Sequence, residues 1–130
     1  MGSVPYIIST TDYEGRPTVL TNRCFQAHVS KWGDSDKDTR LKFVPRLARV
    51  IENPRVVIAD PGHVGRNRYI DLVWDAEVSD HLLTMVVVVD FTPSPQEIVT
   101  WMIKRRLSDE IITGGVIYDS SRCDQCQDEL

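Results

Sequence analysis

The side chains in this sequence that are best suited to chemistry are histidines, arginines and one threonine in a strand-like run. They are His28, His63, His81, Arg66, Arg68 and Thr100, followed by the cations of "KRR" at residues 104–106. Histidine transfers protons near neutral pH, arginine binds phosphate through two parallel hydrogen bonds, and a hydroxyl donates to a phosphate oxygen. One reaction that needs only such groups is cleavage of RNA by its own 2′-hydroxyl, which requires a base, an acid and donors around the phosphorus.

The sequence signatures of other common catalytic sites are missing. The chain has no P-loop, GxSxG, HExxH or GxGxxG motif, and "PGHVG" at 61–65 holds two glycines with no helical pattern after it. Cys123 and Cys126 form "CDQC" in a polar C-terminal stretch, without the two further ligands that a zinc site needs. We therefore predict no metal and no cofactor, with redox or metal use of the two cysteines as the alternative.

Length and charge bound the class of protein. The 130 residues suit one compact domain, expected over 1–120, with a polar tail at 121–130. The net charge of −4 argues against a protein that coats nucleic acid through bulk charge and leaves only a local basic patch for such contacts. No apolar run is long enough to span a bilayer and no basic segment leads into an apolar one, so we predict a soluble, cytoplasmic chain without membrane contacts.

The N-terminal half is predicted to hold one strand and two helices. A strand is expected at 4–10 and an extended segment at 13–21. Apolar positions three and four residues apart then indicate an amphipathic helix over 21–32, capped by Thr21 or Asn22, with His28 on its apolar face. A polar linker at 33–38 leads to a second helix over 39–53, in which Pro45 marks either a kink or the true start.

The C-terminal half has the pattern of β-strands. Strands are expected at 55–60, 68–77, 81–91, 97–105 and 114–120. In 68–77, Arg68 shares one face with Ile70, Leu72 and Trp74, so its side chain would enter a site from the end of the strand. Residues 81–91 lack alternation, which predicts a central strand covered on both faces, with 97–105 as its hairpin partner. The order of elements predicts an α+β fold with helices on one sheet face.

Several short segments then occur in a recognisable order. They are "HV" at 28–29, "IENPRVVI" at 51–58, "RYI" at 68–70, "LLTMVVVV" at 82–89 and "EIVTWM" at 97–102. This succession resembles the phage-associated nuclease family grouped with barnase, EndoU, the colicin tRNases and RelE. The resemblance covers roughly residues 18 to 119. It implies two N-terminal helices packed on a curved four- to five-stranded antiparallel sheet, metal-independent ribonuclease chemistry on an RNA substrate, and a role as a toxin or effector module in phage and bacterial conflict.

The resemblance also implies roles for individual residues. His28 matches the helix histidine and is expected to act as general acid or base, Arg68 as phosphate clamp, and Thr100 as a donor that orients the phosphate. Auxiliary phosphate contacts are assigned by charge type alone to Arg40, Arg66 and Lys104.

Each of these residues also has a structural interpretation. His28 suits a packed core histidine, Arg68 a strand-end cation, and Thr100 an ordinary β-branched strand residue. His63 and His81 fall in predicted turns, where simple exposure is the usual state. The competing function is a non-enzymatic, immunity-type module, since an acidic face can mask a basic nuclease. If the chain is instead the nuclease, an immunity or antitoxin protein is its expected partner.

Overall fold

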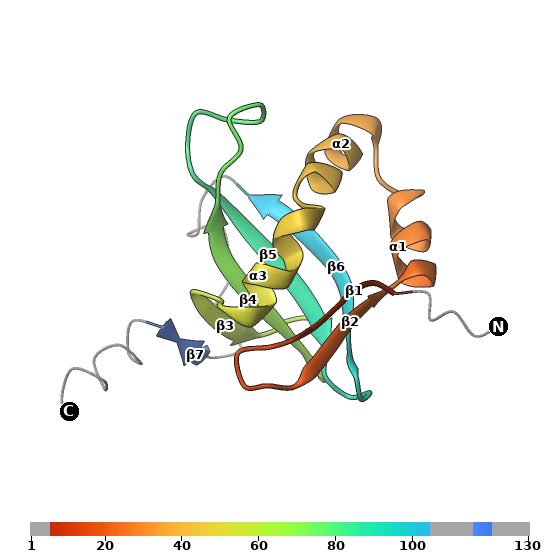
Figure 1. Cartoon of the computed structure of the whole chain (residues 1–130), viewed down its shortest axis with the longest axis vertical. Coiled ribbons are helices and arrows are strands. Elements are labelled where there is room, and N and C mark those ends of the chain that lie inside the picture. The colour runs from red at the N-terminus through yellow and green to blue at the C-terminus, as the bar shows by residue number, and fades with distance from the viewer. Residues whose placement is uncertain (1–5, 105–115, 121–130) are drawn as a thin grey trace.

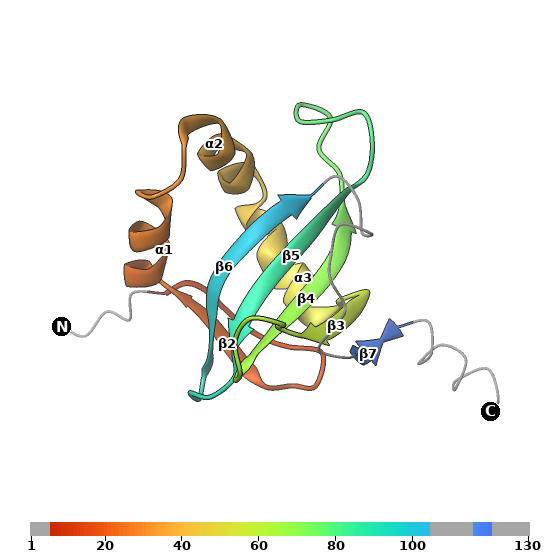
Figure 2. The same cartoon turned by 180° about the vertical axis from the view of Figure 1, so that it is seen from behind.

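The computed structural model of the chain describes residues 6–104 and 116–120, apart from the side chains of 34–36. One seven-stranded sheet forms its centre, with the described helices along one face and one edge (Figures 1 and 2). The strands are β1 (Tyr6–Thr11), β2 (Pro17–Thr21), β3 (Val56–Ala59), β4 (Arg66–Val73), β5 (Leu83–Asp90), β6 (Gln96–Lys104) and β7 (Val116–Asp119). Their order across the sheet is β1-β2-β6-β5-β4-β3-β7. Neighbours are antiparallel, except that β2 runs parallel to β6.

Three short α-helices and a 3₁₀ turn connect β2 to β3. They are α1 (Asn22–Val29), α2 (Asp34–Lys42), η1 (Val44–Arg46) and α3 (Leu47–Glu52). The Thr21 hydroxyl caps α1 by accepting the Cys24 N–H at 3.0 Å. In α3, the buried residues Leu47, Val50 and Ile51 recur at helical spacing and face the sheet. This helix therefore covers the face of the sheet on which the main core forms.

Trp101 of β6 anchors the helices to the sheet. Its side chain is fully buried, stacks with Phe25 of α1 at 6.2 Å between ring centroids, and meets Trp32 edge-on at 5.0 Å. The indole N–H donates to the Arg40 carbonyl of α2 at 3.0 Å. A smaller apolar cluster of Ile58, Ile70 and Val86 lies on the other face of the sheet. No described helix covers that second face (Figure 2).

The predicted α+β class is confirmed, but the predicted arrangement is wrong in detail. The sheet has seven strands and is mixed, because residues 17–21 form a full strand that pairs with β1 and runs parallel to β6. The predicted helix over 39–53 is two helices. Of the two alternatives at Pro45, a helix start is the nearer one, since this proline lies in the first turn of the 3₁₀ segment that leads directly into α3 at Leu47. The segment read as a polar linker is the first part of α2.

The predicted strands of the C-terminal half are confirmed as β3 to β7. All of β5 from Leu83 to Val89 is buried, as expected for a central strand, and β6 is its antiparallel partner. The strand predicted over 68–77 begins earlier and ends at Val73, which leaves Trp74 outside the core with 51% of its surface exposed. The described residues contain no helix long and apolar enough to cross a membrane. The "CDQC" motif, Arg105, Arg106 and the tail at 121–130 lie outside the described residues.

Candidate functional site

The helix-free face of the sheet brings Arg68 and Thr100 together. Strand register pairs Arg68 of β4 with Val88 of β5, and Val88 in turn with Thr100 of β6. Side chains directly opposite one another in a sheet share a face, so the arginine and the hydroxyl flank Val88. Two strand spacings separate their backbones, or about 10 Å. A phosphate group held above Val88 would therefore lie between a cation and a hydroxyl donor.

A β-bulge in β6 decides the orientation of Thr100. Val89 pairs with Ile98 whereas Val88 pairs with Thr100, so Val99 is an extra residue without its own partner on β5. Without this extra residue, alternation would turn Thr100 toward the helices and Trp101 away from them. The Cys24 thiol of α1 lies at the bulge, 3.3 Å from the Ile98 carbonyl and 3.4 Å from that of Val99. The bulge thus buries the tryptophan and presents the hydroxyl on the opposite face.

The Thr100 hydroxyl and the Arg66 guanidinium make no hydrogen bond or ion pair with any described residue. Arg66 lies one row below Arg68 on the same face, where register pairs it with Asp90 and Asp90 with Glu97. Lys104 shares this face but is set apart from Thr100 by the apolar row that contains Val86 and Met102. The structure therefore groups Arg66, Arg68 and Thr100, and places Lys104 further along the sheet.

Asp60 holds Arg68 in place. The guanidinium Nη2 of Arg68 lies 3.5 Å from Oδ1 of Asp60, whose side chain is only 4% exposed. The other carboxylate oxygen lies 3.9 Å from Nδ1 of His63, which is in the exposed turn between β3 and β4. The carboxylate also accepts the Gly62 N–H at 2.8 Å, which fixes the turn. One buried acid thus lies within ion-pair distance of both a cation and a histidine.

His28 lies in the last turn of α1, the helix that directly follows β2 (Figures 1 and 2). It is half-buried, and its side chain makes no hydrogen bond with the described part of the chain. Burial lowers the pKa of His28 below 6.5, and the positive charges of Lys31, Arg40 and Arg66 lower it further. The imidazole is therefore neutral at pH 7, the form that accepts a proton.

Arg40 is engaged in packing. Its Nη1 donates to the Trp101 carbonyl at 2.9 Å, and its guanidinium carbon lies 4.5 Å from the centroid of the Trp32 ring. These contacts tie α2 to the free edge of β6. Arg40 acts on His28 through its charge, and we find no geometry that directs it toward the row formed by Arg68 and Thr100.

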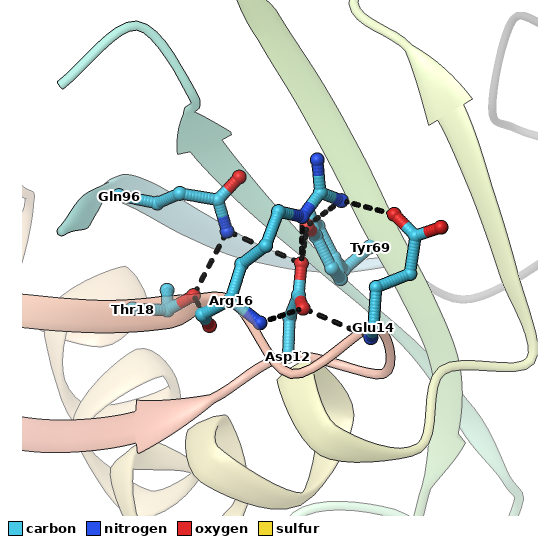
Figure 3. A network of polar contacts seen from close by, with 6 residues as sticks. All are labelled: Asp12, Glu14, Arg16, Thr18, Tyr69 and Gln96. Carbon is cyan, nitrogen blue, oxygen red and sulfur yellow. Dashed lines mark hydrogen bonds and ion pairs between the residues drawn. The ribbon is translucent and has the colours of Figure 1, made fainter. Parts of the chain in front are cut away.

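A buried carboxylate at the β1–β2 turn locks the sheet that carries these residues (Figure 3). The Asp12 side chain is fully buried and accepts five hydrogen bonds. Oδ1 accepts the amides of Glu14 and Arg16 at 2.9 and 2.8 Å. Oδ2 accepts Arg16 Nε at 2.9 Å, the Tyr69 hydroxyl at 2.8 Å and the Gln96 amide at 3.2 Å. The network therefore joins the β1–β2 hairpin to β4 and β6.

The Asp12 network is predicted to make the free energy of unfolding depend on pH in the acid range. Burial raises the pKa of Asp12, but hydrogen bonds from the Arg16 amide, the Tyr69 hydroxyl and the Glu14 amide outweigh it, and the net pKa lies below 3.8. A carboxyl group whose pKa is lower in the folded than in the unfolded state stabilises the fold at pH values above its unfolded-state pKa. That contribution is lost as the pH falls through its folded-state pKa. Denaturant titrations from pH 5 to pH 2 should show this loss in the parent, and a Glu14→Gln variant should retain it.

Sequence reasoning missed Asp12 and Asp60. The signal for Asp12 was the turn "TDYEGRP", in which an aspartate precedes Gly15 with its positive φ of 84° and can bond the amides that follow it. The signal for Asp60 was its place directly after a strand and before "PG". Among the described side chains, no group of three potential ligands is placed to hold a metal ion.

Comparison with known proteins gives one finding. The family model described as phage-Barnase-EndoU-ColicinE5/D-RelE like nuclease 2 matches residues 8–119, which is most of the chain and includes every element from β2 to β7. No curated protein and no solved structure shows a significant match.

Proposed function

Because the chain belongs to the phage-Barnase-EndoU-ColicinE5/D-RelE like nuclease 2 family, we propose that it is a small endoribonuclease that cleaves RNA without a metal ion. In the proposed reaction the 2′-oxygen attacks the adjacent phosphorus and the bond from phosphorus to the 5′-oxygen breaks. A base takes the proton of the 2′-hydroxyl, and an acid gives a proton to the leaving 5′-oxygen. The products are a 2′,3′-cyclic phosphate and a free 5′-hydroxyl.

The row of Arg68, Val88 and Thr100 is the observation that carries this proposal. A cation and a hydroxyl lie on either side of one position on a sheet face. Arg68 would bind the non-bridging oxygens as their charge grows, and Thr100 would donate to one of them. Arg66, which has no ion-pair partner among the described residues, supplies a further positive charge. The functional interpretation of Thr100 is favoured by its free hydroxyl and by the bulge that orients it.

His28 is the proposed general base. Its lowered pKa keeps it neutral at the pH at which it must accept a proton. The influence of Arg66 on this pKa links the histidine electrostatically to the face that carries Arg68 and Thr100.

His63 is the proposed general acid. Its imidazole is exposed and lies 3.9 Å from Asp60, the carboxylate that also contacts Arg68. An exposed histidine next to a carboxylate can carry the proton that the leaving oxygen needs, and the carboxylate orients the ring. The two histidines would then come from different elements, α1 and the β3–β4 turn.

The biological setting follows from the family and is part of the same proposal. A ribonuclease grouped with phage-associated nucleases would act as a toxin or effector on RNA in the cytoplasm, with an immunity or antitoxin protein as its partner. Such a partner would be expected to cover the helix-free face, because occupying that face blocks the phosphate position.

Analysis of the reaction products tests the chemistry directly. We expect purified protein in EDTA to cut a short RNA and leave 2′,3′-cyclic phosphate ends, detected by mass spectrometry. A matched oligonucleotide with a single 2′-deoxy position should resist cleavage at that position, because the attacking oxygen is missing. Products with 5′-phosphate ends, or equal cutting at the deoxy position, would rule out this mechanism.

A further inference from the structure

A second basic site lies between α3 and the end of β4 that is far from the β3–β4 turn. A cavity of about 370 Å³ opens between α3 and the end of this strand. Three arginines, Arg46, Arg49 and Arg55, line it together with Trp74. We call this site the arginine pocket. Trp74 is 51% exposed, which is unusual for the largest apolar side chain and leaves surface for a ligand to cover.

The positive charge of the arginine pocket is largely unbalanced. The guanidinium groups of Arg49 and Arg55 make no hydrogen bond or ion pair with any residue that the structure describes. Arg46 donates through Nη2 to the Trp74 carbonyl at 3.2 Å, which holds it at the rim without neutralising it. Asp71 is the single acid of the lining. Three guanidinium groups around one cavity repel one another, and a bound anion relieves that repulsion.

The chemistry of the lining specifies the ligand. Guanidinium groups bind phosphate through paired hydrogen bonds, and an indole offers a face on which a nucleobase stacks. We propose that the arginine pocket binds an RNA phosphate with an adjacent base stacked on Trp74, as a second contact outside the catalytic face. This inference rests on the proposed function for the identity of the polymer. It also explains how a chain of net charge −4 holds RNA, since the positive charge is local.

The position of the pocket restricts the substrate. Trp74 lies six residues after Arg68 in the direction of β4, and at the rise of an extended chain the two residues are about 20 Å apart. The pocket is lined by residues of α3 and of the end of β4, so a dinucleotide bound at Arg68 and Thr100 cannot span the distance to it. Only an RNA of many nucleotides, or a folded RNA, contacts both. The inferred substrate class is therefore a structured or long RNA.

Direct binding tests this inference independently of cleavage. The His28→Ala chain, in EDTA, would be titrated into a fluorescein-labelled RNA hairpin, with and without the added pair Arg49→Ala and Arg55→Ala. We expect the pair to weaken binding by about tenfold to a hundredfold and to make the slope of log K against log salt shallower by about 1 to 2. Adding Trp74→Ala alone should cost about tenfold, and Trp74→Tyr should restore most of it.

The matched control removes the same charge elsewhere. Arg23→Ala with Lys37→Ala changes the net charge equally at two α-helical side chains outside the pocket, and should weaken binding by less than the pocket pair. If the pocket pair binds the hairpin as tightly as its parent, or no more weakly than this control, the inference is overturned. Absence of RNA binding by the His28→Ala chain overturns it as well. Failure of the proposed function would appear instead as intact RNA with the unmodified chain, whatever the binding data show.

Discussion

His28→Ala is expected to lower kcat/KM for RNA cleavage by about 10²- to 10⁴-fold, the range that one general acid or base contributes. The loss should not come from unfolding. The imidazole makes no hydrogen bond to the described residues, and alanine is well tolerated in the last turn of α1. Single-turnover cleavage of a defined oligonucleotide would give the value, with thermal unfolding recorded on the same samples.

A histidine elsewhere on the surface provides the control. His81 is exposed and lies next to a separate cavity lined by Ser79, Leu82 and Lys104. His81→Ala should leave kcat/KM within about threefold of the parent, as expected for a surface substitution away from the reacting atoms. Equal losses for the two alanine variants would contradict the role given to His28.

The pH dependence of the cleavage rate distinguishes a general base from a residue that serves only in packing. A base must be neutral, so the rate should rise with pH through the pKa of His28, and the lowered pKa places this rise below pH 6.5. Removing the charge of Lys31 in Lys31→Gln should raise that pKa and move the rise to higher pH. An unmoved profile would mean that another group accepts the proton.

Asp12→Ala is expected to lower the free energy of unfolding by about 3–5 kcal/mol, because it leaves buried partners without their acceptor. The Tyr69 hydroxyl and the Arg16 side chain lose their carboxylate, while Gln96 keeps its 2.9 Å bond to the Thr18 hydroxyl. Equilibrium unfolding in urea would measure the change. The exposed pair of Glu14 and Arg16, 3.0 Å apart, gives the comparison, and Glu14→Ala should cost less than about 1 kcal/mol.

A small effect of Asp12→Ala would show that the β1–β2 hairpin docks independently of this network. A loss as large as expected would make the network the main polar link between the hairpin and the strands that carry Arg68 and Thr100. In that case the variant should also lose ribonuclease activity at temperatures where its fold is partly unfolded, and regain it on cooling.

The strands of the C-terminal half were predictable because their patterns are local. A run such as "LLTMVVVV" needs cover on both faces, and β5 is the middle strand of the seven, buried from Leu83 to Val89. The seven-stranded mixed sheet was not predictable in the same way. The contact between β2 and β6 is a short parallel pairing of residues almost eighty positions apart, and no periodicity in either strand encodes it.

The candidate site was predictable in residue type more than in geometry. Simple alternation within 97–105 would place Thr100 and Glu97 on opposite faces of the sheet. Only the bulge at Val99 brings both side chains onto the helix-free face. The restraint of Arg68 by Asp60 depends on a turn whose shape follows from Gly62 and Gly65. The predicted strand over 68–77 includes Trp74, yet β4 ends one residue earlier, at Val73. Bulges and strand ends are set by tertiary packing, so the sequence pattern does not reveal them.

The measurement that tests the central claim most directly is cleavage of total cellular RNA in EDTA by the unmodified protein, His28→Ala and Thr100→Ala. All three proteins would be compared at matched thermal stability. We predict that the unmodified protein degrades the RNA and that both variants lose most of this activity. Intact RNA with the unmodified protein, or undiminished cutting by both variants, would contradict the assignment of ribonuclease chemistry to this face of the sheet.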